Sequence, residues 1–264
     1  MQASQAHIDI TILGSGTCVP SLERSACSVL LRIGRSVVVL DTGSGTTRRL
    51  LQAGQSIFDI SHIFYSHLHP DHSAELVPLL FSTKYPDIQK RQFPLTFVAG
   101  SGFGEHLKKL KAVYGQWIAL PADMMSIIEL DTTGPDSVRF KDFRVDSIPV
   151  EHNPESLAYR FSGPQGGAVV YSGDTDYSEN LIQLARDADV LICESALPDE
   201  MKVTGHLTPS QAGDIATRAR VAKLVLTHFY PECDQTDIVS QCRKTYKGPL
   251  ILARDLLNIP LATG

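Results

Sequence analysis

The sequence predicts an α/β (α+β) fold, specifically a four-layer αβ/βα sandwich in which two mixed β-sheets face each other and helices lie outside. Two observations support this prediction. Apolar runs of strand length open each half of the chain, and segments of helical character follow them. The 264 residues, 43% hydrophobic and 20% charged, suffice for one sizeable core, and no linker or low-complexity segment divides them. We therefore expect a single domain over residues 1–264.

The first half of the chain is predicted to begin with strands and to continue into helices. Gly34 and Arg35 form a two-residue turn between two strands. Gly54 is expected to end the first helix, because glycine readily adopts the left-handed conformation found after helices. The predicted strands cover residues 8–13, 28–33, 36–41 and 60–65, and the predicted helices cover 46–53, 75–81 and 103–113.

The second half repeats this order of strands followed by helices. Thr208 is expected to cap a helix whose first residue is Pro209, because proline suits that position. A glycine-rich turn at 163–167 separates two strands. The predictions are a strand pair within 140–150, strands at 157–161, 168–172, 190–193 and 223–227, and helices at 209–220 and 236–245.

Charge, cysteine content and hydrophobic pattern limit the expected partners and location of the protein. The formal charge of −5 provides no overall positive field, so DNA is not an expected partner. The first residues lack the features of a signal peptide, and no apolar stretch reaches the roughly 18–20 residues of a membrane span. The five cysteines form no Cys-x-x-Cys pair, and Cys193 lies in an apolar run as a core residue would. We expect a cytoplasmic protein without a membrane partner.

One six-residue stretch carries most of the functional signal: His67, His69, Asp71 and His72 follow a predicted buried strand. Ligands of open α/β sheets bind at the carboxyl ends of strands. Crowded imidazoles and a carboxylate are costly to desolvate unless a cation holds them together. An exposed histidine-rich turn is the alternative interpretation, but this spacing after a strand favours a metal-binding loop.

Three further polar residues follow predicted strands: His152, Asp174 and His228. Each alone could be an ordinary solvated loop residue. Together with the histidine-rich loop they provide donors for two ions, with Asp174 as the bridge. Ligands rich in nitrogen and free of thiolate suit Zn²⁺ first, with Mn²⁺ or Fe²⁺ as alternatives. The two predicted sets are His67, His69 and His152 for one ion, and Asp71, His72 and His228 for the other.

His206 is the predicted proton donor, because it precedes a helix and no apolar surrounding requires an imidazole there. The alternative is a histidine that only assists the start of the helix. Glu194, at the end of a predicted strand, could orient His206 or a metal ligand, or it could be an exposed carboxylate. His7, His62 and His106 have no comparable context.

These motifs resemble the metallo-β-lactamase fold superfamily, and within it the ribonuclease Z-like branch. The resemblance spans nearly the whole chain and implies a dizinc αβ/βα sandwich, phosphodiester hydrolysis and, in many members, a homodimer. It also implies that Asp71 both binds a metal and helps to position or deprotonate the nucleophilic water. The matching segments are Leu13–Thr17 with Pro20 and Arg24, Leu40–Thr46 with Arg49 and Leu50, Ser66–His72, His152, Ser172–Asp174, His206–Thr208 and Leu226–His228.

The sequence departs from the family pattern between His152 and Asp174, which are only 22 positions apart. Members that process the 3′ end of transfer RNA carry a long arm in this interval, and there is no room for one here. The basic segment 108–111 is better explained as one solvated face of a helix. Armless relatives that act on cyclic phosphodiesters match this spacing better.

Three functions remain open on sequence grounds. The leading one is a dinuclear-metal hydrolase of small or cyclic phosphodiesters. The second is a ribonuclease Z-type endoribonuclease, acting in transfer-RNA 3′ processing without the gripping arm. The third is a non-catalytic sensor or binding protein built on the metal pocket. His206 argues against the third, because a binding protein needs no proton donor.

Overall fold

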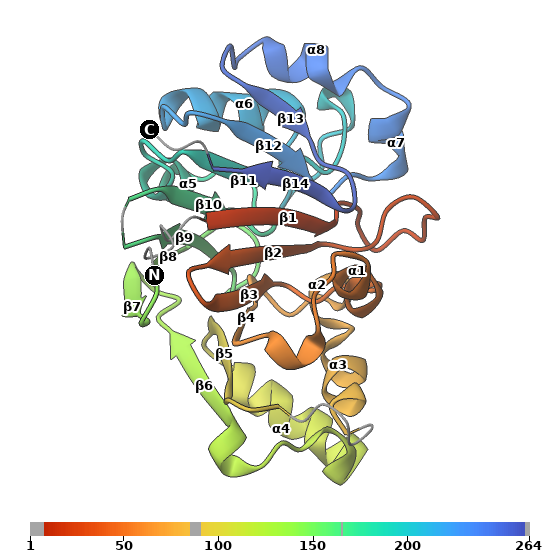
Figure 1. The fold of residues 1–264 in the computed structure, drawn as a ribbon. Coiled ribbons are helices and arrows are strands. Elements are labelled where there is room, and N and C mark those ends of the chain that lie inside the picture. Colours follow the sequence, from red (N-terminus) through yellow and green to blue (C-terminus); the bar gives the residue numbers. More distant parts are fainter. Residues whose placement is uncertain (1–7, 85–90, 165, 262–264) are drawn as a thin grey trace.

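The computed structural model describes residues 8–84, 91–164 and 166–261, and it contains two seven-stranded sheets that face each other. Helices cover the outer sides of both sheets (Figure 1). The predicted four-layer sandwich of two mixed sheets is confirmed.

The first sheet combines an antiparallel part with a parallel part. Strands β14, β1, β2 and β3 pair antiparallel, and β3 to β6 pair parallel. The predicted two-residue turn joins β2 to β3, since Ile33 pairs with Ser36. The strands are β1 (Ile8–Gly14), β2 (Ser28–Ile33), β3 (Ser36–Leu40), β4 (His62–Phe64), β5 (Leu95–Gly100), β6 (Met125–Leu130) and β14 (Leu257–Pro260).

The second sheet has the same mixed character. Strands β7, β8, β9 and β10 pair antiparallel, and β10 to β13 pair parallel. Both sheets therefore have a group of parallel strands whose carboxyl ends lie at one edge. The strands are β7 (Asp136–Arg139), β8 (Arg144–Pro149), β9 (Leu157–Ser162), β10 (Ala168–Tyr171), β11 (Val190–Glu194), β12 (Leu224–Thr227) and β13 (Leu250–Leu252).

The alternation of side chains along the strands explains the layered core. Val29 and Leu31 of β2 pack in the cluster between the two sheets, whereas Leu30 packs in the cluster under the helices. All three side chains are buried because both faces of the sheet are covered. Tyr159 and Phe161 fill the space between the sheets from the opposite side.

Helices α1, α3 and α4 cover the first sheet, and α5, α6 and α8 lie over the second (Figure 1). The predicted cap is present: Thr208 and Gln211 form a capping box at the start of α6. The helices are α1 (Thr46–Gln52), α2 (Pro70–Ser73), α3 (Leu76–Ser82), α4 (Phe103–Tyr114), α5 (Glu179–Leu184), α6 (Pro209–Arg218), α7 (Pro231–Asp234) and α8 (Ile238–Arg243), with 3₁₀ turns η1 (Ile57–Asp59), η2 (Gly115–Ile118), η3 (Ala122–Met124) and η4 (Asp199–Met201).

The strand pair predicted within 140–150 is wrong in its position. The pair is β7 with β8, and residues 140–143 form the turn between them. Phe140 and Phe143 gave the turn the apolar pattern of a strand. Their rings instead pack against His62, with centroids 4.4 and 5.2 Å from its ring. The two C-terminal helices are also shorter than predicted, ending at Arg218 and Arg243.

Four strands, β5, β6, β13 and β14, were not among those predicted. Strand β6 at the sheet edge keeps most of its side chains partly or fully exposed, so its sequence lacks a clear alternation. Within the described ranges no helix is long and apolar enough to cross a bilayer.

Candidate active site

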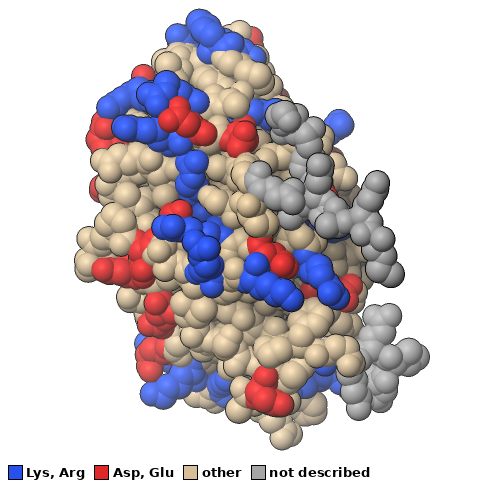
Figure 2. Space-filling model, turned by 60° about the vertical axis from the view of Figure 1, so that its left-hand side comes forward, with Lys and Arg blue, Asp and Glu red and all other residues tan. Residues whose placement is uncertain are grey.

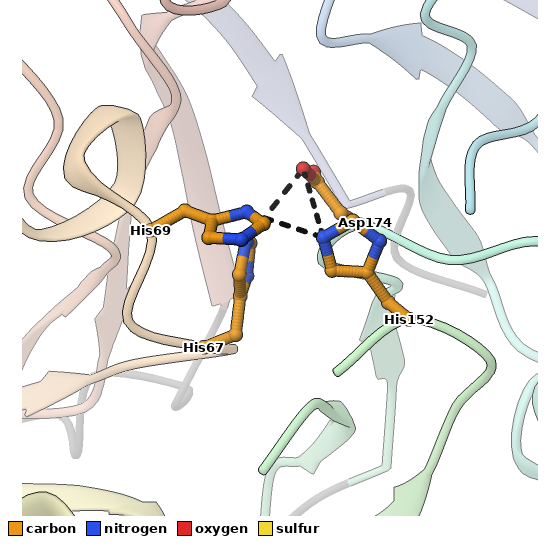
Figure 3. Close-up of side chains that lie close together, drawn as sticks. All are labelled: His67, His69, His152 and Asp174. Carbon is orange, nitrogen blue, oxygen red and sulfur yellow. Dashed lines mark hydrogen bonds and ion pairs between the residues drawn. The ribbon is translucent and has the colours of Figure 1, made fainter. Parts of the chain in front are cut away.

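The structure brings together all seven side chains that the sequence proposed as metal ligands. Potential ligand atoms of His67, His69, His152 and Asp174 lie within 4.8 Å of one another (Figure 3). The second group, Asp71, His72 and His228, satisfies the same limit. The two groups correspond to the two predicted ligand sets, with Asp174 close to both: its carboxylate oxygens lie 3.2 Å from His72 Nε2 and 3.7 Å from His67 Nε2.

Strand ends position each of these residues. The histidine-rich loop follows β4, His152 follows β8, Asp174 follows β10, and His228 follows β12. Pro70 opens the short helix α2, which carries two of the donors. The two sheets thus deliver donors from opposite sides to one edge of the sandwich.

Close backbone approach is required where the two halves meet. Gly173 adopts a positive φ of 57°, and a Cβ atom there would lie 2.5 Å from Cβ of Ser66. Only glycine fits at such a position. His228 also has a positive φ, 62°, an uncommon conformation for a non-glycine residue and one that clusters at functional sites.

Buried polar atoms without hydrogen-bond partners indicate that a cation fits here. Among the described residues, His67 Nε2 and Asp174 Oδ1 are buried and form no hydrogen bond. Both atoms face the same small volume, and His228 Nε2 lies 3.4 Å from Asp174 Oδ1. Native proteins rarely leave such groups unsatisfied, and imidazole nitrogen with carboxylate oxygen is a ligand set suited to zinc.

The electrostatic environment keeps His67 and Asp71 in the form that binds metal, whereas at His72 the carboxylates of Asp174 and Asp41 outweigh burial and raise the pKa well above its usual value. Burial, reinforced by neighbouring His72, lowers the pKa of His67 well below its usual value. Burial alone would raise the pKa of Asp71, but the hydrogen bond and charge of His228 and the charge of His72 lower it to about 2. Neutral imidazole and ionised carboxylate are the states that coordinate a cation.

Asp41 is a functional residue that the sequence did not reveal. This fully buried carboxylate accepts hydrogen bonds from the backbone N–H of Ser66 (2.7 Å), the hydroxyl of Ser66 (2.7 Å), His72 Nδ1 (2.7 Å) and the hydroxyl of Tyr171 (2.6 Å). It therefore holds His72 with Nε2 turned toward the site. The Asp-Thr-Gly motif that follows β3 was the available signal.

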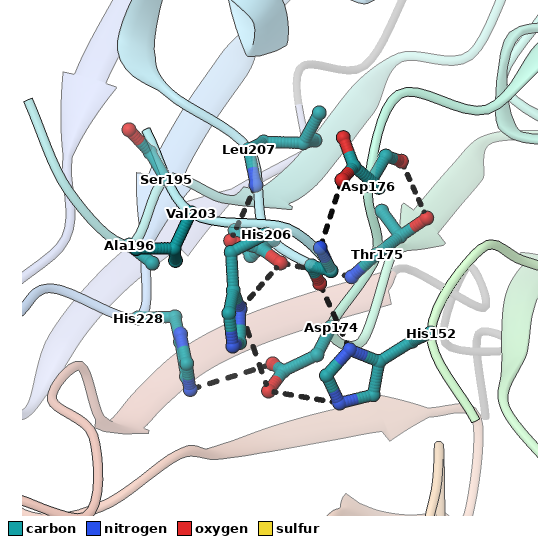
Figure 4. A network of polar contacts seen from close by, with 12 residues as sticks. His152, Asp174, Thr175, Asp176, Ser195, Ala196, Val203, His206, Leu207 and His228 are labelled. Carbon is teal, nitrogen blue, oxygen red and sulfur yellow. Dashed lines mark hydrogen bonds and ion pairs between the residues drawn. The ribbon is translucent and has the colours of Figure 1, made fainter. Parts of the chain in front are cut away.

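His206 lies beside Asp174 and His228 (Figure 4), and Glu194 is its hydrogen-bond partner. Its Nδ1 atom lies 3.0 Å from Glu194 Oε1, and the imidazole also groups with Asp174 and His228. Glu194 is only 1% exposed and accepts hydrogen bonds from the backbone N–H groups of Thr175 and Leu207. The alternative of an exposed carboxylate is therefore wrong, because Glu194 is buried and hydrogen-bonded to His206.

The hydrogen bond with Glu194 also affects the pKa of His206. Burial by itself lowers the pKa of this imidazole, but the hydrogen bond and negative charge of Glu194 outweigh burial and raise it to about 9. His206 consequently carries a proton at neutral pH, as a general acid must.

The remaining histidines lie outside the site or outside the description. His62 is half-buried among phenylalanine rings, and His106 lies on α4. His7 precedes the described residues.

Two hollows flank the cluster. One, of about 410 Å³, opens beside Asp71 and is lined by the loop between β1 and β2 together with Ser44, Pro70 and Ala74. The other, of about 600 Å³, lies beside His152 and includes Glu151 and Asp176. Hollows of this size hold small molecules.

The chain belongs to the β-lactamase superfamily, because the protein-family model described as "Beta-lactamase superfamily domain" matches residues 37–229. It is 28% identical to ribonuclease Z of Methanothermobacter thermautotrophicus, over 96% of both chains. The solved structure of the short form of human tRNase Z is 25% identical, covers 97% of this chain and 100% of its own, and gives a TM-score of 0.77.

A further solved structure confirms the fold alone: the metallo-β-lactamase fold protein YhfI of Bacillus subtilis superposes with a TM-score of 0.83 at 20% identity. It covers 97% of this chain and 100% of its own. The predicted superfamily and its ribonuclease Z-like branch are confirmed by these similarities.

Proposed function

We propose that this protein is a dinuclear-metal-dependent hydrolase that cleaves small or cyclic phosphodiesters. The observation that carries the proposal is the convergence of two ligand sets beside His206, which is held by Glu194 at 3.0 Å, at the opening of a hollow of small-molecule size. The enzyme class, a metal-dependent hydrolase of the ribonuclease Z and phosphodiesterase type, agrees with the relatives.

The residues divide the chemical tasks. Two divalent cations, when bound, would supply a reactive water at neutral pH and neutralise the charge of the phosphate. His67, His69 and His152 would hold one cation, and Asp71, His72 and His228 the other, with Asp174 between them. Asp71, only partly buried at the opening, would also position the attacking water or accept its proton.

His206 would protonate the departing oxygen. Its Nδ1 atom is engaged by Glu194, so Nε2 is the atom that can donate toward a substrate. The imidazole stacks on His228, with centroids 5.4 Å apart and planes inclined by 16°, which keeps the donor beside the metal ligands. Proton donation of this kind contributes typically 10²–10⁴-fold to the rate.

Two features favour a small substrate over folded RNA. Strands β9 and β10 are joined by a turn of five residues, 163–167, so no arm extends from this hairpin. In Figure 2, basic and acidic side chains are interspersed over the face shown. Several surface cations are paired, as in Arg220–Asp187 at 2.8 Å. An extended RNA would need a continuous positive surface.

The second candidate is an endoribonuclease that lacks the arm, and the ribonuclease Z relatives favour it. The alignment with the Methanothermobacter enzyme spans 304 positions, more than the 264 residues of this chain. That relative therefore carries segments for which this sequence has no counterpart.

A substrate panel tests the proposal. Purified protein with a measured metal content would be assayed, at equal enzyme concentration, on cyclic nucleotides, on bis(p-nitrophenyl) phosphate and on precursor transfer RNA. We expect turnover of the small phosphodiesters to exceed RNA cleavage. Efficient RNA cleavage would support the second candidate, and a protein with two bound ions that hydrolyses none of the three would support a sensor or binding protein.

Three finer assignments extend the proposal: zinc as the resident ion, a cytoplasmic location and a homodimer. Elemental analysis of protein purified without added metal tests the first. Cell fractionation tests the second, and sedimentation equilibrium tests the third.

A further inference from the structure

Two histidines of the site, His72 and His152, have a hydrogen-bond partner at the nitrogen that faces away from the cluster. Nδ1 of His72 donates to Asp41 at 2.7 Å, and Nδ1 of His152 donates to the carbonyl oxygen of Gly205 at 2.8 Å. Both partners can only accept, so in each ring Nδ1 carries a proton and Nε2 is the atom turned toward the site.

His69 is arranged in the opposite way. Its Nδ1 atom faces the cluster, 3.3 Å from His152 Nε2, and its Nε2 atom faces away, 3.0 Å from the amide nitrogen Nδ2 of Asn153 as the side chain is placed. Within the described ranges, this amide is the hydrogen-bond partner of Nε2. His69 is exposed, and its Nδ1 atom has His152 Nε2 as its partner on the side of the cluster.

The amide of Asn153 can present either its oxygen or its nitrogen to His69, because a half-turn about the Cβ–Cγ bond exchanges them without changing shape. An NH₂ group facing Nε2 would require the ring proton on Nδ1, pointing into the cluster. An oxygen facing Nε2 instead accepts the Nε2 proton and leaves the Nδ1 lone pair directed at the other ligands. Only the second arrangement allows His69 to bind a cation together with His67 and His152.

We propose that Asn153 is a positioning residue for the metal site: its amide oxygen accepts the Nε2 proton of His69 and thereby sets the affinity for the ion held by His67, His69 and His152. This inference rests on the metal centre of the proposed function. It assigns a role to a residue that lies behind a proposed metal ligand and is not itself among the proposed ligands.

The backbone around Asn153 is held independently of its amide. The N–H of Asn153 donates to the hydroxyl of Ser156 at 3.0 Å, and the N–H of Ser156 donates to the carbonyl oxygen of Asn153 at 2.9 Å. Substitution of the side chain should therefore leave the turn that carries His152 in place.

Three variants test the proposal. Asn153→Leu removes the acceptor at similar size, Asn153→Ala removes it without adding bulk, and Asn153→Asp keeps an acceptor oxygen. Asn180→Leu is the matched control, because the amide of Asn180 bonds to the carbonyl oxygen of Pro149 and contacts no proposed ligand. The measurement is zinc affinity of the purified, folded proteins, by competition with a chromophoric chelator.

We expect Asn153→Leu and Asn153→Ala to bind one of the two zinc ions about 10–100-fold more weakly, the usual effect of losing a partner behind a metal ligand. Asn153→Asp should stay within about threefold of the parent, as should Asn180→Leu. Parental affinity for both ions in the Leu and Ala variants would overturn the inference, as would an equal loss in Asn153→Asp.

The outcomes for this inference and for the proposed function can be told apart. If the parent protein binds two zinc ions but hydrolyses no phosphodiester, the proposed function fails and the affinity comparison still decides the role of Asn153. If the parent binds no zinc, the metal centre and this inference fail together.

Discussion

Asp174 is a buried carboxylate at the centre of the candidate metal site. It lies 2% exposed between two groups of imidazoles, and His228 and His72 hold its pKa well below the usual value despite burial. A carboxylate so enclosed by nitrogen donors is suited to a position between two cations.

The role of Asp174 leads to a first prediction. Asp174→Ala should bind at least one metal ion fewer than the parent, because the proposed bridge is lost. Asp71→Ala should abolish turnover, and in the metal-free proteins it should leave the unfolding temperature nearly unchanged, since Asp71 is only partly buried. Elemental analysis measures the metal content of Asp174→Ala. A phosphodiester assay and thermal unfolding measure the turnover and the stability of Asp71→Ala. Asp71→Ala protein that turned over substrate at the parental rate would contradict the proposed mechanism.

His206 gives a second prediction at this scale. His206→Ala should lower kcat about 10²–10⁴-fold for a substrate whose departing group is an aliphatic alkoxide, because that group needs a proton. The same variant should lose much less activity on bis(p-nitrophenyl) phosphate, whose departing phenolate is stable without one. Equal losses on both substrates would show that His206 has no proton-donor role.

At the residue scale, the sequence revealed ligands more readily than their partners. His67, Asp174 and His228 each follow an apolar strand, so their positions could be predicted from the pattern alone. Asp41 and Asn153 could not, because a carboxylate before Thr-Gly or an asparagine before proline is equally typical of an ordinary turn.

Among the elements, the turn between β7 and β8 has the clearest physical consequence. Phe140 and Phe143 enclose His62 at the start of β4. Burial lowers the pKa of this imidazole to about 4, so it stays neutral in the folded protein. In the unfolded chain its pKa returns to about 6.5.

Burial of neutral His62 should make the folded protein less stable at acidic pH. Below pH 6.5 the unfolded chain takes up a proton at His62 that the folded protein does not, so folding stability falls as the pH decreases from 6.5 to 4. The loss should reach about 2–3 kcal/mol for this residue. Urea unfolding at pH 7.5 and 4.5 should show a smaller pH effect for His62→Leu than for the parent. Parallel pH dependences in the two proteins would contradict this account.

Element prediction succeeded at several strands that are covered on both sides. The runs at β2, β3, β11 and β12 are mostly apolar, so their character and place were predictable, whereas β5, equally buried, was missed. It failed at β6, on an exposed edge, and at the β7–β8 turn, where aromatic residues in a loop imitate strand periodicity. Local pattern cannot distinguish a loop that covers the core from a strand within it.

For the molecule as a whole, the strongest prediction concerns metal removal. Each ion present at 1,000 times its dissociation constant stabilises the folded state by about 4 kcal/mol, provided that the unfolded chain binds none. In a protein of this size 1 kcal/mol corresponds to roughly 2–4 °C. Complete removal of two ions by a chelator should therefore lower the unfolding temperature by about 10 °C or more. An unchanged temperature, with elemental analysis showing the metal gone, would contradict the proposed centre.

A network of charges ties distant parts of the chain together near the site. Asp255, 5% exposed by its side chain, accepts hydrogen bonds from Ser15, Ser25 and Arg49, while Arg24 pairs with Asp234 at 2.7 Å. Asp255→Ala should destabilise the protein by about 3–5 kcal/mol, because it leaves the Arg49 charge without its partner. Chemical denaturation measures the loss; a change below 1 kcal/mol would show that solvent replaces the pair.

The strand-end placement of the ligands has a consequence for biosynthesis. The loop at 66–72 leaves the ribosome early, whereas Asp174 and His228 are made only after most of the chain. A nascent polypeptide that has reached Asp174 contains the whole first ligand set but lacks His228, so the second set is complete only after β12 is translated. The two ion sites are thus completed one after the other during synthesis.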